Sequence, residues 1–315
     1  MIKPLDRVHL PAELVLLVAE LLKPQDQLSL LRAIPELAPL LTIQHISVRD
    51  GDGNTLLHLL AEEAMCKLLM ALLAKNTTFL NARNKGGSTP LSLAARRGHG
   101  MVVKVLVQRD DIEVNSKDNR WWTPLSWAAS RGNKDIVNLL LERDDIAADS
   151  KDVHSRTPLY LAADHEHEEV VRLLAERDDV NPDSKDDFGS TPLSNAAYHG
   201  HEALVKLLLD REDVDADSKD SLRQTPLMCA AERGHEAVVK LLVKRDDVDP
   251  DAKDEDGRTA LSHAAEYGHE IVVKLLMDRE DVDIGSKDNE GRTPLSWASG
   301  CGHRTVMKLL MERDQ

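Results

Sequence analysis

Apolar residues recur along most of the chain at the spacing of a helix that buries one face. In HEAVVKLLVKR, residues 235–245, Val238, Leu241 and Leu242 follow the i, i+3, i+4 pattern of such a helix. A shorter helix is predicted over segments such as TPLSWASG, which begins at Thr293. Threonine is a good N-cap, and the proline after it loses no hydrogen bond at the first helical position. The chain therefore predicts pairs of short helices separated by turn-forming residues.

The pair repeats every 34 residues. The threonine that starts the shorter helix returns at Thr55, Thr89, Thr123, Thr157, Thr191, Thr225, Thr259 and Thr293. Eight units therefore fill residues 49–315. A unit of this size cannot bury its own apolar stripe, so we expect the units to stack on one another.

The unit TPL-x-x-AA-x-x-GH, followed by a second helix and an extended turn, resembles the ankyrin repeat. The resemblance implies an all-α fold, a right-handed ankyrin α-solenoid with short β-turn fingers. The period of 34 exceeds the roughly 33 residues usual in that family. The family's histidine after TPL survives only as His58; serine replaces it in most units, with Tyr160 and Met228 as exceptions. TPLSWAA and RDDVDxDSKD look most like the long ankyrin arrays common in filamentous fungi.

Composition narrows the class of protein. The chain is 42% hydrophobic but only 3% aromatic, which favours an aliphatic core of stacked helices. Its net charge of −15 argues against binding to nucleic acid or an anionic membrane. Cys66, Cys229 and Cys301 lie far apart and predict no disulfide framework. Without a signal-like or membrane-spanning segment, we expect a soluble monomer in the cytoplasm or nucleus.

No motif predicts a cofactor or a metal ion. A phosphate-binding glycine loop, a CxxC pair and an HExxH motif are all missing from the sequence. DHEHEE, residues 164–169, contains two histidines, but His167 is the usual histidine of the repeat. Only His165 is then an additional imidazole, so we predict no metal site.

Residues 1–48 do not follow the repeat. Helical periodicity interrupted by Pro24 and Pro35 predicts two or three short helices. LPAEL and the leucines after it resemble an F-box, which implies docking on the adaptor of a cullin ubiquitin ligase. The residues that carry this resemblance are Leu10, Pro11, Glu13, Leu14, Leu21, Leu22, Leu28 and Leu31. The alternative is an N-terminal helical cap that covers the apolar edge of the first repeat.

Departures from the repeat mark candidate contact residues on the fingers, which normally read D-x-x-G-x-T. Trp121, Ser155 and Arg223 replace the glycine in their units. Because tryptophan and arginine dominate binding hot spots, we predict contacts at exposed finger positions. These are Trp121, Trp122, His154, Phe188, Leu222 and Arg223. Alternatively, a tryptophan folds back on its own hairpin.

The first helix of each unit carries a second set of candidates. Positions four and eight residues after the threonine share one helical face, which in ankyrin proteins lines a concave groove. Trp127 and Trp297 flank a polar stretch of this face. The predicted groove comprises Trp127, Tyr160, His165, Asn195, Tyr198, His199, Met228, Cys229, Arg233, His263, Tyr267 and Trp297.

These features lead to two hypotheses about function. The first is an interaction scaffold that binds a protein partner through groove and fingers and recruits it to ubiquitin ligation through residues 1–48. The second is an enzyme or small-molecule binder whose candidate catalytic residues are His263, Cys229 and Tyr267. A Cys-His-Asn triad is excluded, because Asn195 lies about 16–20 Å from His263 at the usual spacing of packed helices.

Overall fold

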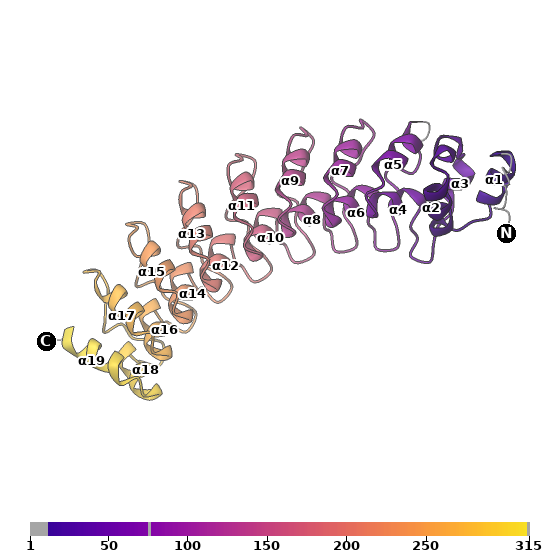
Figure 1. Cartoon of the computed structure of the whole chain (residues 1–315). Coiled ribbons are helices and arrows are strands. Elements are labelled where there is room, and N and C mark those ends of the chain that lie inside the picture. The colour runs from indigo at the N-terminus through magenta and orange to yellow at the C-terminus, as the bar shows by residue number, and fades with distance from the viewer. Residues whose placement is uncertain (1–11, 75–76, 314–315) are drawn as a thin grey trace, which may run out of the picture. The chain divides into compact units, whose positions relative to one another are not determined.

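The computed structural model describes residues 12–74 and 77–313. It contains two compact units, Met1–Ser150 and Lys151–Gln315, which are described separately. All secondary-structure elements in the described ranges are helices (Figure 1). This confirms the all-α prediction.

In the first unit, helix pairs follow an N-terminal segment. They are α4 (Leu56–Glu62) with α5 (Cys66–Leu73), α6 (Pro90–Arg97) with α7 (Gly100–Val107), and α8 (Pro124–Ser130) with α9 (Lys134–Leu141). The first helices α4, α6 and α8 pack side by side, and the second helices α5, α7 and α9 form another layer (Figure 1).

The second unit repeats this arrangement. Its pairs are α10 (Pro158–Asp164) with α11 (Glu168–Ala175), α12 (Pro192–His199) with α13 (Glu202–Leu209), α14 (Pro226–Arg233) with α15 (Glu236–Leu242), α16 (Ala260–Tyr267) with α17 (Glu270–Met277), and α18 (Pro294–Cys301) with α19 (Arg304–Arg313). Leu227 and Ala231 of α14 and Val239 and Leu242 of α15 are fully buried between the two layers. The predicted stack of helix pairs is therefore confirmed.

The helices begin and end where the local sequence signals place them. Thr225 accepts a hydrogen bond from the backbone amide of Met228 at 3.3 Å, so it is the N-cap of α14. Gly234 ends that helix in the left-handed conformation with φ of 73°. A Cβ atom at Gly234 would lie 2.5 Å from Nδ1 of His269 in the next pair, so this position also requires glycine for space.

The histidine after this glycine joins neighbouring helix pairs. Nε2 of His235 donates to the carbonyl of Tyr198 at 2.9 Å, one pair earlier. His269 makes the same bond to the carbonyl of Glu232 at 2.9 Å. The bonds have a defined length and direction, so they determine how far one pair is displaced from the next.

An arginine after several of the second helices forms another joint. In Arg245, Nε and Nη2 bond both carboxylate oxygens of Asp247, at 2.8 and 2.6 Å. Its Nη1 reaches back to the carbonyl of Leu209 at 3.0 Å. Asp247 therefore holds the guanidinium in the orientation that bonds the preceding pair. Arg143, Arg211 and Arg279 repeat this arrangement.

The change from histidine to serine after TPL removes one inter-pair bond. His58 accepts a hydrogen bond from the amide of Thr55 at 3.1 Å and donates through Nε2 to the carbonyl of Ser88 at 3.0 Å. Ser92 reaches only its own N-cap, with its Oγ 3.0 Å from Oγ1 of Thr89. The fold persists because the histidine and arginine joints remain.

Residues before the first repeat form α1 (Ala12–Ala19), α2 (Pro24–Ala33), η1 (Pro35–Leu40) and α3 (Ile43–Ser47). The helices α2 and α3 pack on α4, and η1 packs on α5, so the segment covers the first pair. Leu28, Leu31 and Ile46 are buried in this contact.

The leucines of the F-box-like motif do not share one environment. Leu28 and Leu31 are buried, whereas Leu21 is 87% exposed and Leu22 is half-buried. Leu10 and Pro11 lie outside the described residues, as do the side chains of Glu13 and Leu14.

The finger glycine has a left-handed backbone, which its replacements share. Gly189 and Gly257 have φ of 76° and 78°, and Trp121, Ser155 and Arg223 have φ of 61°, 63° and 62°. A side chain at such an angle costs free energy because Cβ approaches the following carbonyl oxygen.

We therefore expect Arg223→Gly to stabilise the protein by about 1 kcal/mol, after allowing for the extra freedom that glycine gives the unfolded chain. Urea unfolding followed by circular dichroism measures this change. The matched control is Arg223→Ala, which removes the same side chain and keeps the strain. Equal stability of the two variants would contradict the prediction.

Candidate protein-binding surface

An aspartate organises most of the fingers, and Asn84 takes its place in one of them. Oδ1 of Asp118 accepts hydrogen bonds from the amides of Arg120 and Trp122 at 2.9 and 3.0 Å. The same pair of bonds, to the second and fourth residues after the aspartate, occurs at Asp50, Asp152, Asp186, Asp220, Asp254 and Asp288. We call these residues the finger aspartates. Their second oxygen remains for another donor.

At three fingers, a donor to this oxygen comes from the first helix of the same repeat. Nε1 of Trp127 donates to Oδ2 of Asp118 at 3.0 Å, and Nε1 of Trp297 donates to Oδ2 of Asp288 at 3.1 Å. His263 donates through Nε2 to Oδ2 of Asp254 at 2.9 Å. Each donor follows its aspartate by nine residues. Tryptophan and histidine at this position therefore both donate a hydrogen bond to the finger aspartate.

The Asp254–His263 pair is buried, with both side chains 5% exposed. Burial alone would raise the pKa of Asp254, but hydrogen bonds from His263 and from the amides of Arg258 and Asp256 lower it overall. Nδ1 of His263 is also buried and makes no hydrogen bond. The imidazole thus has its known partner inside its own repeat.

At the finger aspartate Asp186, the bond to Oδ2 comes from Tyr160, and Asn195 bonds Tyr160 in turn. The hydroxyl of Tyr160 donates to Oδ2 of the finger aspartate Asp186 at 2.9 Å. Nδ2 of Asn195 donates to the Tyr160 hydroxyl at 3.1 Å and to Asp164 at 3.2 Å. Burial and the Asp186 carboxylate raise the pKa of Tyr160. The exceptional tyrosine after TPL therefore replaces the missing donor at position 195.

Cys229 occupies the equivalent position in α14 and is only 5% exposed. Burial, with Asp220 and Glu232 nearby, raises the pKa of its thiol to about 12, so it is not ionised at neutral pH. His263 pairs with Asp254. Met228 is also buried. Neither Met228 nor Cys229 is therefore open to solvent.

The fingertips divide into buried and exposed residues. Trp122 was expected to be exposed, but it is 8% exposed and packs on Trp127 with ring centroids 4.4 Å apart. Trp121 is 56% exposed, with the ammonium of Lys117 5.3 Å from its ring. Phe188 is 75% exposed. His154, Leu222 and Arg223 are also exposed.

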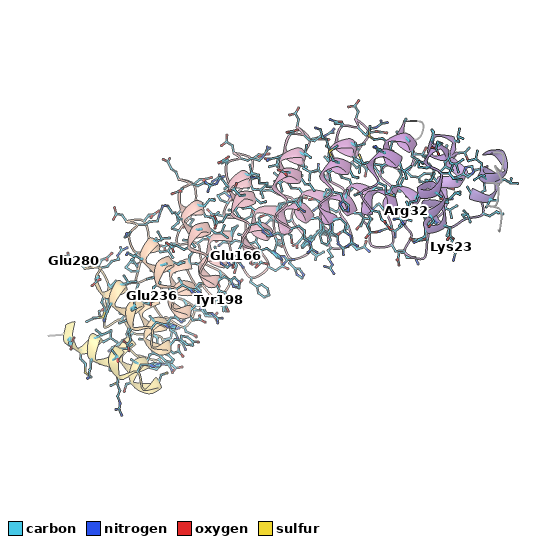
Figure 2. All side chains as sticks on the ribbon, in the orientation of Figure 1. Lys23, Arg32, Glu166, Tyr198, Glu236 and Glu280 are labelled. Atoms are coloured by element: carbon cyan, nitrogen blue, oxygen red, sulfur yellow. The ribbon has the colours of Figure 1, made fainter. Side chains whose placement is uncertain are left out.

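The ends of the first helices in the second unit carry an exposed polar and aromatic surface. We call it the helix-end strip, and it consists of His165, Tyr198, His199, Arg233 and Tyr267. Tyr198 is labelled in Figure 2. The Arg233 guanidinium lies over its ring, 4.2 Å from the ring centroid, and Tyr198 contacts His199 edge to face. Tyr267 is 52% exposed; burial and the carboxylates of Glu232 and Glu266 raise its pKa.

The two helix positions that were predicted to line one groove therefore differ in their surroundings. Positions four residues after the threonine are filled by residues that pack or that complete the fingers. Positions eight residues after it remain exposed in the helix-end strip. The finger aspartates were missed in the sequence, although their constant spacing of nine residues from the tryptophans and His263 is visible there.

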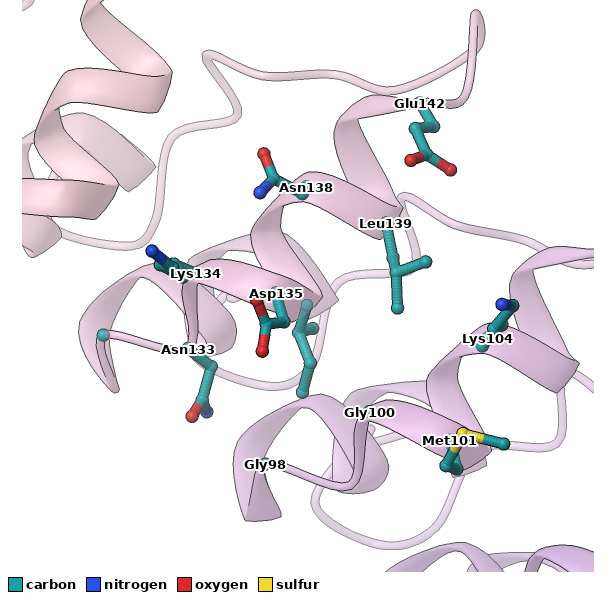
Figure 3. Close-up of a pocket in the computed structure, with 12 residues that line it drawn as sticks. Gly98, Gly100, Met101, Lys104, Asn133, Lys134, Asp135, Asn138, Leu139 and Glu142 are labelled. Atoms are coloured by element: carbon teal, nitrogen blue, oxygen red, sulfur yellow. The ribbon is translucent and has the colours of Figure 1, made fainter.

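Two second helices of the first unit border a surface pocket. It lies between α7 and α9 and has a volume of about 740 Å³ (Figure 3). Met101 and Leu139 contribute apolar surface, and Lys104, Asp135 and Glu142 contribute charges of both signs. This mixed lining indicates no particular ligand.

In residues 12–74 and 77–313, no group of three His, Cys, Asp or Glu side chains is placed to hold a metal ion. None of the helices described there is long and apolar enough to cross a membrane.

Comparison with protein families agrees with this architecture. The family model described as Ankyrin repeats (3 copies) matches residues 30–118, 111–186, 178–254 and 246–315. The chain belongs to the ankyrin-repeat family. No curated protein matches it. Ankyrin repeats are general protein-interaction modules, so the helix-end strip and the fingers are the surfaces to consider for a partner.

The bond from His263 to its finger aspartate leads to a prediction about this ankyrin repeat. His263→Trp should keep the stability of the protein, because tryptophan bonds the aspartate at two equivalent positions. His263→Phe should lose about 1–3 kcal/mol, because it leaves the buried Asp254 carboxylate short of a donor. Urea unfolding of both variants measures the difference. Equal stability of the tryptophan and phenylalanine variants would show that the hydrogen bond contributes nothing.

Proposed function

We propose that this ankyrin protein is an interaction scaffold whose second unit binds a protein partner through the helix-end strip and the fingertips at Phe188 and Leu222. The main support is the exposure of Tyr198, Arg233 and Tyr267. Tyrosine and arginine are residue types that supply most of the binding energy at protein interfaces.

The contacts of the strip support a binding role over a packing role. The residues four positions earlier on these helices are half-buried or buried: His263 bonds its finger aspartate, and Asn195 bonds Tyr160 and Asp164 of α10. Tyr267 instead leaves half of its surface to solvent. Arg233 stacks on Tyr198, which holds both side chains in place before a partner binds.

The fingertips extend this surface with apolar area. The amide of Ser221 donates to the carbonyl of Phe188 at 2.9 Å, and the amide of Glu255 donates to the carbonyl of Leu222 at 2.9 Å. Neighbouring fingers are thus hydrogen-bonded to one another. They present Phe188 and Leu222 on a backbone that requires little ordering on binding.

The test is a triple variant, Tyr198→Ser, Arg233→Ser and Tyr267→Ser, compared with the wild-type protein by quantitative affinity purification. We expect the specific partner to be reduced at least tenfold, because each substitution removes a hot-spot side chain. Ile271→Ser is the matched control: it removes an equally exposed apolar side chain from the second helix α17. A partner lost equally from both variants, or kept by both, would contradict the proposal.

We further propose that residues 1–48 dock on the adaptor of a cullin ubiquitin ligase while they cover the first repeat. The F-box-like leucines support the identity of the partner. Leu17, Val18 and Leu21 support a docking role, because they are exposed on and just after α1, while other apolar residues of the segment pack on the repeat. A segment that only caps the repeat needs no second apolar face.

Purified adaptor and full-length protein provide a direct test by calorimetry. We expect binding, and we expect Leu17→Asp with Leu21→Asp to abolish it while the circular dichroism spectrum is unchanged. The strip variant serves as the control and should bind the adaptor normally. No binding by the wild-type protein would remove the ligase role and leave the segment as a cap.

A further inference from the structure

A column of asparagine and aspartate residues joins the turns of neighbouring repeats. We call it the joint column; the members discussed are Asn81, Asn115, Asp183, Asp217 and Asp251, which keep the 34-residue register. In the first unit, Oδ1 of Asn81 accepts from the amide of Glu113 at 2.9 Å. Its Nδ2 donates to the carbonyl of Asp111 at 2.7 Å. Each asparagine side chain is therefore bonded at both ends.

Asn115 repeats this geometry. It accepts from the amide of Ala147 at 2.9 Å and donates to the carbonyl of Asp145 at 2.6 Å. The acceptor bond spans 32 residues and the donor bond spans 30 residues, as at Asn81. Two independent joints of the first unit thus place an N–H donor against the same carbonyl position.

The second unit keeps the acceptor bond and changes the donor. Oδ2 of Asp183 accepts from the amide of Asp215 at 2.9 Å, again spanning 32 residues. The corresponding bonds of Asp217 and Asp251 measure 2.6 and 2.8 Å. In all three residues, the other oxygen, Oδ1, is buried and makes no hydrogen bond. The asparagines donate to a carbonyl 30 residues later. At the same spacing, Oδ1 of Asp183, Asp217 and Asp251 faces the carbonyls of Asp213, Asp247 and Asp281, respectively.

An ionised carboxylate is a poor fit for that place, because two oxygens without a hydrogen between them repel each other. A protonated carboxyl group fits, because its O–H donates as the asparagine N–H does. We propose that Asp183, Asp217 and Asp251 each act as a neutral carboxyl group whose O–H donates a hydrogen bond to the carbonyl of the next repeat. The joints of the second unit would then become more stable in mildly acidic solution.

The charges around the three carboxyls favour the neutral form. Asp183 faces Asp213, Asp215, Lys185 and Arg211; Asp217 faces Asp215, Asp247 and Asp249; Asp251 faces Asp249, Asp281 and Asp283. Arg211 is already bonded to both carboxylate oxygens of Asp213. Lys185 is the other cation in these sets, and its ammonium donates to the carbonyl of Lys219 at 2.7 Å.

Burial raises the pKa of each of the three carboxyls above 3.8, and neighbouring carboxylates add to the effect. The folded state therefore binds more protons than the unfolded state just above that pH. The stability that these three carboxyls contribute is fully present below pH 3.8. It is lost as the pH rises through their pKa in the folded protein. Each unit of pKa difference corresponds to about tenfold in the folding equilibrium.

Other aspartates act in the opposite direction at lower pH. The pKa of Asp152 and Asp288 is lowered overall: burial opposes the shift, but hydrogen bonds from arginine side chains and backbone amides outweigh it. Their contribution is lost as the pH falls through values below 3.8. The joint column therefore gains stability at a higher pH than the pH at which Asp152 and Asp288 become protonated and lose theirs.

The decisive variant replaces all three joint aspartates, Asp183→Asn, Asp217→Asn and Asp251→Asn, in the full chain. At neutral pH its urea midpoint should exceed that of the wild-type protein, because asparagine supplies the missing donor. The gap should narrow as the pH falls from neutral towards 3.8, because the wild-type carboxyls take up protons as the pH passes through their raised pKa. The infrared difference spectrum, wild type minus variant, should show additional intensity in the protonated-carboxyl C=O band at the acidic end.

Matched controls separate protonation from a general loss of negative charge. Glu176→Gln with Asp210→Asn and Asp278→Asn removes three exposed carboxylates that lie outside these sets, and the acid stabilisation should remain. Asn115→Asp should introduce the pH dependence into the first unit. A stability gap that stays constant with pH, or an infrared band unaffected by the triple substitution, would overturn the proposal.

Discussion

A helix pair of this chain has no core of its own, and the rest of the structure depends on that constraint. Leu227 and Val239 lie between two helix layers and become buried only because neighbouring pairs complete those layers. Apolar burial supplies the driving force but no direction, since it depends on area alone. The position of each pair on the next must therefore come from interactions with a defined geometry.

Polar joints supply that geometry. His235 and Arg245 both reach back to carbonyls of the preceding pair, and each ends on an acceptor that a shift of the pair would remove. The guanidinium is oriented by Asp247 within its own turn, which directs its remaining N–H group toward the preceding pair. The joint column adds a bond of the same kind, in which an amide and a carboxyl occupy one backbone geometry with different chemistry.

Variation between repeats has to be interpreted through these bonds. Trp127, His263 and Trp297 look unrelated, yet each completes a finger by donating to its aspartate. Tyr198 and Tyr267 differ in kind, because they lie exposed at helix ends. A repeat protein can change a residue to preserve its structure or to bind a partner. A changed residue that bonds another side chain of the same repeat preserves the structure, whereas one that is left exposed is available to bind another protein.

Local chemistry made much of the fold predictable. The 34-residue period, the threonine N-caps and the glycine C-caps depend on contacts within one turn, so the sequence alone determined where helices begin and end. It also indicated that Phe188 and Tyr267 belong to positions that face solvent.

Burial of the long side chains was decided only by the tertiary structure. Trp121 and Trp122 are adjacent in sequence, but the left-handed backbone at Trp121 leaves one ring in solvent while the other packs on Trp127. Cys229 and His263 were expected to line an open groove and are instead buried. The reason is physical. Helix signals act over a few residues, whereas burial depends on which neighbouring repeat covers a side chain and on which acceptor it can reach.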